Sequence, residues 1–166
     1  MLNREVQVIK KTEKTNVMRL LEQKKIDYKS YDYTETGVVS GVDVAKALGQ
    51  NPDQVYKTLV TQGATKNYYV FLVPVEKELN LKAGAKAVGE KSIAMIKSKE
   101  LLPLTGYIHG GCSPIGMKKQ FKTVIDTSVT NFETIFFSAG KIGYQVEVAV
   151  KDIEKIVRYE LGDITE

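Results

Sequence analysis

Apolar and polar residues recur along this chain with two periods, and the changes of period mark the predicted elements. Apolar residues spaced three or four apart after a capping side chain predict helices at 15–25, 40–48 and 79–88. Alternating or short continuous apolar runs predict strands at 27–33, 57–61, 68–75, 92–96, 121–126, 134–137 and 144–150. Shorter helical segments are predicted at 51–53 and at 98–102, the latter stopped by Pro103. An amphipathic helix is predicted at 151–159.

Helices and strands are interleaved in this order, but several strands are joined by short turns. Residues 63–67 and 138–143 are the clearest turns. Short turns join antiparallel strands, whereas a doubly wound parallel sheet needs a crossover between neighbouring strands. The pattern therefore predicts an α+β fold with a mixed, largely antiparallel sheet and helices outside it. No repeat or linker interrupts the chain, so one domain is expected over residues 1–166.

Composition places the chain among ordinary globular proteins. It has 166 residues, of which 43% are hydrophobic and 27% charged. The longest apolar run, residues 68–75, is far shorter than the roughly 20 residues of a membrane span. Charged residues within 1–10 argue against a signal peptide, and a single cysteine cannot form an intramolecular disulfide. A cytoplasmic protein that does not contact the membrane is expected.

The distribution of charge is more informative than the net value of +4. Three stretches contain no carboxylate: residues 54–75, 101–125 and 134–146. If they meet in space, they form a cleft that attracts anions such as phosphate groups or RNA. The alternative is that strands and glycine-rich loops are simply poor in acids.

His109 is the single histidine of the chain, which narrows the possible chemistry. One histidine and one cysteine cannot build a zinc site of the usual kind, and the acids show no cluster typical of a magnesium site. A Ser-His-Asp mechanism would have to use His109. No metal and no cofactor are expected.

The most unusual segment is the glycine-rich stretch 106–119. Gly111 and Gly116 have the spacing of a P-loop, but Met117 replaces its lysine and Lys118 replaces its serine or threonine, so an NTPase is rejected. Two interpretations remain. The segment is either a tight strand connection or a nest of backbone amides that binds an oxyanion.

Three further features are weak when each is taken alone. The hairpin loop 137–143 combines Ser138 with Lys141 and two glycines, and it either holds a ribose or phosphate group or is a simple turn. Lys57 begins an apolar strand, where a cation faces a cleft or extends to the surface. Cys112 follows His109 by three residues, but in a loop this spacing fixes no geometry for a nucleophilic pair.

Together these segments resemble one protein family. "Lys57-Thr-Leu", the stretch from Gly106 to Lys119 and "Ser138-Ala-Gly-Lys-Ile-Gly" occur in the order and spacing of the YbaK/EbsC family, as does Pro74-Val75 before Glu78-Leu-Asn-Leu-Lys. The resemblance covers residues 15–159. Its members are free-standing aminoacyl-tRNA deacylases, related to the editing domain of bacterial prolyl-tRNA synthetase, and the Cys-tRNA(Pro) deacylase branch is the most similar.

This resemblance implies a sheet curled into a barrel-like core and assigns roles to individual residues. Catalysis would rest on Lys57 near the 3′-terminal nucleotide or ester, on the Gly110 backbone near the scissile carbonyl, and on the Ser138 hydroxyl. The implied substrate-binding residues are Tyr33, Thr58, Gly111, Ser113, Gly140 and Lys141. The cysteinyl thiol of the substrate would attack its own ester, so no catalytic triad is needed. The implied partners are mischarged tRNA(Pro) and prolyl-tRNA synthetase, not DNA.

Three hypotheses follow. The first is a trans-acting editing hydrolase for Cys-tRNA(Pro) or for another mischarged tRNA such as Ala-tRNA(Pro). The second is a module that binds tRNA or a synthetase without catalysis. The third is a thiol hydrolase that uses Cys112 and His109. Cys112 and Gln145 both depart from the common family pattern, which leaves the substrate preference open.

Overall fold

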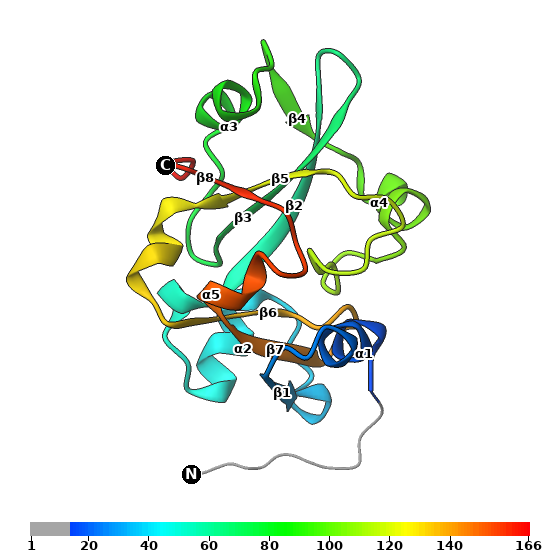
Figure 1. Ribbon diagram of the computed structural model, residues 1–166, viewed down its shortest axis with the longest axis vertical. Coiled ribbons are helices and arrows are strands. Elements are labelled where there is room, and N and C mark those ends of the chain that lie inside the picture. Colours follow the sequence, from blue (N-terminus) through cyan, green and yellow to red (C-terminus); the bar gives the residue numbers. More distant parts are fainter. Residues whose placement is uncertain (1–13) are drawn as a thin grey trace.

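The computed structural model describes residues 14–166 (Figure 1). The charged residues within 1–10, which argue against a signal peptide, lie outside the described part of the chain. The α-helices of the described part are α1 (Asn16–Gln23), α2 (Gly41–Leu48), α3 (Leu81–Val88), α4 (Ser98–Thr105) and α5 (Val150–Ile153). Its strands are β1 (Tyr28–Asp32), β2 (Tyr56–Gly63), β3 (Tyr68–Pro74), β4 (Ile93–Met95), β5 (Lys122–Asp126), β6 (Thr134–Ser138), β7 (Tyr144–Ala149) and β8 (Glu160–Gly162).

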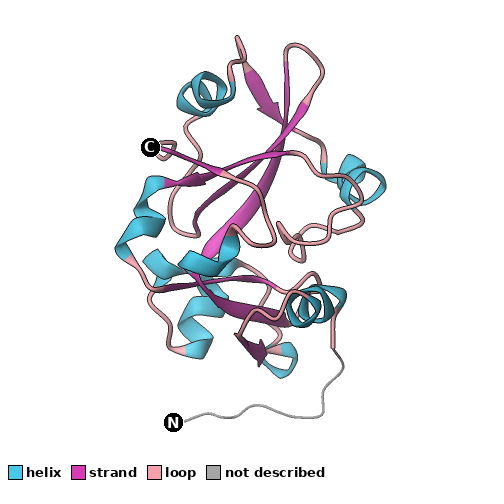
Figure 2. Ribbon diagram, viewed as in Figure 1, coloured by secondary structure: helices cyan, strands magenta, loops and turns pink. Residues whose placement is uncertain are grey.

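The strands form two sheets, which occupy the two halves of the molecule in Figure 2. One sheet has the order β1-β7-β6 and is antiparallel. The other has the order β4-β2-β3-β5-β8, in which β5 pairs in parallel with both β3 and β8. An isolated bridge between Val55 and Phe136 links the sheets. The predicted mixed, largely antiparallel α+β fold is confirmed, whereas the barrel-like closure stays a prediction.

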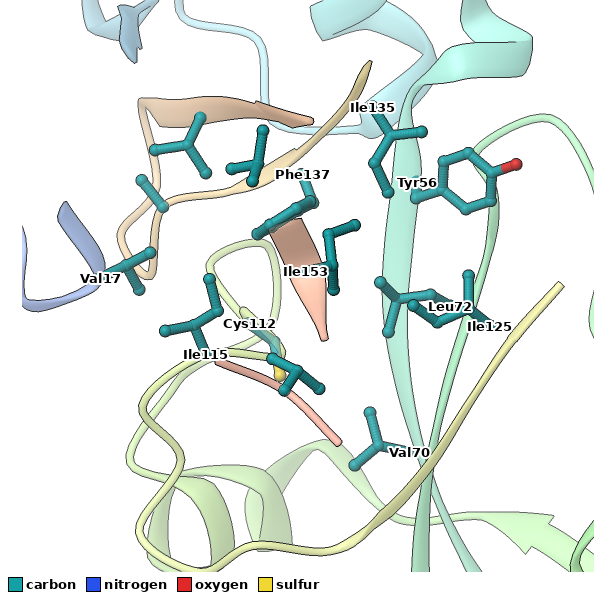
Figure 3. Packing of buried hydrophobic residues seen from close by; sticks show 14 of the residues in the cluster. Val17, Tyr56, Val70, Leu72, Cys112, Ile115, Ile125, Ile135, Phe137 and Ile153 are labelled. Atoms are coloured by element: carbon teal, nitrogen blue, oxygen red, sulfur yellow. The ribbon is translucent and has the colours of Figure 1, made fainter. Parts of the chain in front are cut away.

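The main core lies between the sheets, and strand alternation explains its composition. Val70 and Leu72 of β3 face this core, as do Ile135 and Phe137 of β6 (Figure 3). The intervening residues point the other way, because successive side chains of a strand lie on opposite faces. Phe71 thus packs beneath α3, and Phe136 packs beside α2. The five-stranded sheet is therefore apolar on both faces of β3, whereas the outer face of β7, the central strand of the other sheet, carries Gln145 and Glu147.

The helix boundaries follow the capping residues that the sequence predicts. Thr15 and Ser40 accept hydrogen bonds from the third amide after them, at the starts of α1 and α2. Gly49 and Gly89 end α2 and α3 in the left-handed conformation, with φ of 67° and 75°.

Two predictions near the chain's helices are wrong. Pro103 does not stop the segment 98–102; it lies inside α4, and the helix ends two residues later at Thr105. The N–H of the next residue, Gly106, donates to the Leu102 carbonyl. The predicted helix 151–159 is only the short α5, after which the chain turns and adds β8 beside β5. The apolar spacing there suits a helix, but after Ile153 the chain continues in tight turns, in which the Lys155 and Ile156 N–H groups donate to the carbonyls three residues earlier.

None of the helices formed by residues 14–166 is both long enough and apolar enough to cross a membrane.

Candidate functional site

A cavity of about 690 Å³ opens where β2, β6 and the loop after α4 meet. Its walls come from all three carboxylate-free stretches: Lys57 and Thr58 from the first, His109 and Gly110 from the second, and Ser138 from the third. The start of α2 and the segment joining β4 to α4 complete the rim. The three stretches therefore meet in space, which is the condition stated above for a cleft that attracts anions.

The lining of the cavity combines an apolar interior with basic groups and contains no aspartate or glutamate. Two lysines, Lys57 and Lys97, and His109 are its charged or titratable basic side chains. Most of the other lining residues are hydrophobic, among them Val42, Val60 and Leu101. Such a cavity favours a ligand that carries negative charge near its mouth and a small apolar part inside.

Lys57 lies near the start of β2, opposite Val73 of β3. Its side chain is 29% exposed, and its Nζ lies 3.7 Å from the Oε2 atom of Glu78. The Glu78 side chain is 77% exposed, so this ion pair is weak and solvent can compete for it. The ammonium group is therefore available to an anionic ligand.

Gly110 gives the loop its close approach to the cavity. Its φ is +89°, a conformation that favours glycine, and a Cβ there would lie 3.0 Å from the Val39 Cγ1 atom. The Gly110 N–H donates no hydrogen bond within the described residues. A bare amide at a cavity wall is suited to bind a carbonyl oxygen that becomes negatively charged.

Ser138 and Tyr33 form another part of the wall. Ser138 ends β6, and its Oγ accepts a hydrogen bond from the Gly140 N–H at 3.0 Å. Tyr33 is 5% exposed, and burial raises the pKa of its hydroxyl, an effect that the Gly143 amide partly offsets. Tyr33 therefore acts as a neutral hydroxyl at physiological pH.

The side-chain hydroxyl of Thr58, unlike the polar groups near it, has no hydrogen-bond partner. Its Oγ1 atom is buried and is the only such side-chain nitrogen or oxygen without a hydrogen-bond partner within residues 14–166. A buried hydroxyl without a partner costs about 1–3 kcal/mol, so native proteins rarely retain one.

The other residues predicted to bind substrate are not among those that line the cavity. Gly111 packs against the backbone of residues 141–142, where a Cβ would lie 3.0 Å from the Ile142 nitrogen. Gly140 packs on Tyr107, and the Oγ of fully buried Ser113 accepts from the Ile115 N–H at 3.3 Å. Lys141 is exposed, and its Nζ lies 5.6 Å from the centre of the Tyr144 ring. Gly111, Gly140 and Ser113 therefore pack within the two loops and do not face the cavity.

Two polar groups of the wall were not predicted as site residues, although Gln145 was noted above as a departure from the family pattern. Gln145 is 3% exposed, and its amide exchanges two hydrogen bonds with that of Gln50, at 2.7 and 3.0 Å. The Tyr56 hydroxyl lies 2.6 Å from the Ser128 Oγ atom. Both contacts join residues more than seventy positions apart, so no local pattern could have found them.

Cys112 and His109 both line the cavity, but they do not form an activated pair. Cys112 is buried, and burial raises the pKa of its thiol to about 12, partly offset by a hydrogen bond with Thr105. A nucleophilic cysteine needs a lowered pKa, because the thiolate is the reactive form. This thiol is protonated at neutral pH, which argues against the thiol-hydrolase hypothesis.

Comparison with known proteins agrees with this geometry. A model of the aminoacyl-tRNA editing domain family matches residues 36–156. The chain is 43% identical over 158 residues to the candidate Cys-tRNA(Pro)/Cys-tRNA(Cys) deacylase EbsC of Enterococcus faecalis, covering 94% of this chain and 96% of that protein. It is 30% identical over 120 residues to the proline–tRNA ligase of Kosmotoga olearia, covering 70% of this chain and 20% of the ligase.

A solved structure shares the fold. The crystal structure of a candidate trans-editing enzyme for prolyl-tRNA synthetase superposes with a TM-score of 0.78 at 21% identity, covering 90% of this chain and 94% of that one. The resemblance predicted from the sequence motifs is thus confirmed. The chain belongs to the aminoacyl-tRNA editing domain family.

Proposed function

We propose that this protein is a trans-acting deacylase that removes cysteine from mischarged tRNA(Pro) in the cytoplasm. One observation carries the proposal: three carboxylate-free segments meet at a cavity that holds a lysine, a bare glycine amide and an apolar interior. An aminoacyl-tRNA end has the matching properties. Its phosphates are anionic, its ester carbonyl becomes an oxyanion in the reaction, and the cysteinyl side chain is small.

In this proposal the protein binds and orients the ester and supplies no nucleophile. The Lys57 ammonium attracts the 3′-terminal nucleotide and releases Glu78, which is mostly exposed and so loses little. The Gly110 N–H donates a hydrogen bond to the carbonyl oxygen as negative charge develops there. Ser138, whose Oγ already accepts a hydrogen bond from the Gly140 N–H, donates a hydrogen bond from its hydroxyl to the ester region.

The nucleophile is the substrate's own thiol. Its sulfur attacks the ester carbonyl carbon, the bond to the ribose oxygen breaks, and the resulting thiolactone is opened by water. Bringing two groups of one molecule together replaces a second reactant, which is a large source of rate enhancement. Protonated Cys112 takes no part in this step.

The same chemistry gives the selectivity against proline. An apolar pocket discriminates a methylene group by only about 1–3 kcal/mol, so size alone is a weak filter. Proline has no thiol and is retained on its tRNA. Specificity for the tRNA body then depends on contacts outside the cavity or on prolyl-tRNA synthetase as a partner. The described residues work as a single editing domain.

The test is single-turnover deacylation of Cys-tRNA(Pro), Ala-tRNA(Pro) and Pro-tRNA(Pro) by the wild-type protein and the Lys57→Ala variant. Rapid loss of cysteine alone, abolished in the variant, is the expected result. Equal loss of cysteine and alanine would keep the deacylase and discard the thiol mechanism.

The same experiment addresses the remaining alternative. Salt-sensitive binding of tRNA without release of any amino acid, by protein shown to be folded, would instead indicate a binding module.

A further inference from the structure

A row of exposed lysines leads away from the mouth of the cavity, and the inference drawn from it rests on the proposed function and deepens it. Lys97 lines the cavity just before α4, and Lys99 lies in the first turn of that helix. Lys118 and Lys119 belong to the glycine-rich loop, which runs beside α4 (Figure 1). All four side chains are exposed, and together these residues form a lysine track.

Contacts of α4 hold the two ends of the lysine track on one side of the molecule. Leu101 and Thr105 are the buried residues of the helix, so Lys99, offset by two residues from Leu101, projects to solvent. At the other end of α4, the Lys118 N–H donates to the Thr105 carbonyl at 3.0 Å, and the Lys118 Nζ donates to the Pro103 carbonyl at 3.4 Å. The helix has eight residues, so the track extends about 12 Å from the cavity mouth.

The lysine track carries positive charge that nearby carboxylates do not neutralise. Residues 101–125 contain no aspartate or glutamate, and the one acid of α4 is Glu100. Within residues 14–166, none of the four lysines forms an ion pair, whereas Lys14, Lys122 and Lys155 each do. Exposed lysines without ion pairs are available to bind phosphate groups.

The position of the track indicates which molecule occupies it. In the proposed function the aminoacylated 3′ terminus of a tRNA enters the cavity, so the nucleotides before it must leave across the rim. Lys97 belongs to this rim and also begins the track. Successive phosphates of one strand advance by roughly 3.4 Å along a duplex, so a track of about 12 Å faces several of them. An RNA backbone therefore fits both the charge and the length of this surface.

We propose that the lysine track binds the phosphate backbone of the tRNA acceptor end and thereby brings the aminoacyl ester to the cavity. Contacts with phosphates position a nucleic acid but carry no sequence information, so the track raises the affinity for tRNA without selecting tRNA(Pro). The track contributes to binding, and the chemical step depends on the groups inside the cavity.

The test is single-turnover deacylation of Cys-tRNA(Pro) at a series of protein and salt concentrations. The track variant combines Lys99→Gln, Lys118→Gln and Lys119→Gln and leaves the cavity lining intact. We expect the protein concentration that gives the half-maximal rate to rise at least about tenfold at low salt, with little change in the maximal rate. The slope of log affinity against log salt should become shallower by about two to three, because each lost phosphate contact removes about one.

A matched control variant separates the lysine track from net charge. Lys66→Gln, Lys82→Gln and Lys86→Gln together remove the same three charges from exposed residues of the β2–β3 turn and of α3. Helix α3 packs over Phe71, on the face of the five-stranded sheet opposite the main core. This control variant should keep the wild-type half-maximal concentration and salt slope.

A second variant guards against loss of structure. The Lys118 side chain contacts the Pro103 carbonyl, so the track variant could lower the thermal midpoint. The double variant Lys99→Gln/Lys119→Gln keeps that contact. Its salt slope should be shallower by about two, at an unchanged thermal midpoint.

The outcomes separate this inference from the proposed function. Wild-type affinity and salt slope in the track variant, or equal changes in the track and control variants, would overturn the role of the lysine track. A lower maximal rate at an unchanged half-maximal concentration would also overturn it. A wild type that binds tRNA but releases no cysteine would overturn the proposed function, and the salt dependence of that binding in the same variants would still decide whether the track holds the RNA.

Discussion

The two ends of the β2–β3 hairpin treat buried polar groups in opposite ways. At the turn end, the Glu90 carboxylate accepts hydrogen bonds from the Tyr69 hydroxyl at 2.6 Å, from the Thr65 N–H at 3.2 Å and from the Thr65 hydroxyl. At the other end, the Thr58 hydroxyl has no partner, and Lys57 has only a mostly exposed one. A satisfied cluster stabilises the fold, whereas a weakly paired lysine at a cavity is available to an anionic ligand.

The largest expected effect contrasts two lysines of this hairpin. Lys57→Ala should lower Cys-tRNA(Pro) deacylation by about 100-fold or more, comparable to losing one electrostatic contact in other active sites. Lys66→Ala, in the exposed turn at the opposite end, should leave the rate unchanged. Single-turnover rates of both variants test the contrast, and equal losses would show that general basic charge, not the cavity, binds the substrate.

Substitution of Glu90, at the turn end of the hairpin, should lower the stability of the protein and leave its deacylation rate unchanged. Glu90→Gln replaces an acceptor of three hydrogen bonds by an amide that can keep only some of them, so the thermal midpoint should fall by several degrees. The folded variant should deacylate at the wild-type rate. A variant with normal stability and reduced activity would reverse the roles assigned to the two ends.

The same carboxylate gives a pH dependence of defined sign. Hydrogen bonds from Thr65 and then Tyr69 lower the pKa of Glu90 below its ordinary value. The stabilisation is therefore complete above the ordinary glutamate pKa of about 4.3 and is lost as pH falls through the lower folded-state value. Denaturation at a series of pH values should show that the stability gap between wild type and Glu90→Gln narrows on acidification. A gap that stays constant would contradict this assignment.

The smallest expected effect concerns Cys112. Because its thiol is buried and protonated at neutral pH, treatment with iodoacetamide should change the deacylation rate by less than about twofold. Cys112→Ser should likewise remain active. Rapid inactivation of the wild type, absent in Cys112→Ser, would restore the thiol-hydrolase hypothesis.

Local signals in the sequence predicted most of the fold. Thr15, Ser40 and the terminating glycines fixed helix ends because capping depends on residues within one turn. The strand β8 was not predicted because its partner is β5, more than thirty residues earlier. Pairing with a distant open sheet edge cannot be seen in the sequence.

The candidate site likewise combines features that local sequence signals predict with features that depend on long-range contacts. The glycine-rich loop and the absence of acids pointed to the correct segments, since both depend on residue type alone. The unsatisfied state of Thr58 and the pairing of Gln50 with Gln145 depend on what each side chain meets after folding. These properties emerge only in three dimensions.

The most direct test of the substrate-thiol mechanism compares the release of cysteine and serine from the same tRNA(Pro). The two aminoacyl groups differ in one atom, so a pocket of fixed size separates them poorly, whereas a thiolate forms far more readily than an alkoxide. Single-turnover release of cysteine should therefore be at least about 100-fold faster than release of serine. Comparable rates for the two would contradict a reaction driven by the substrate's own thiol.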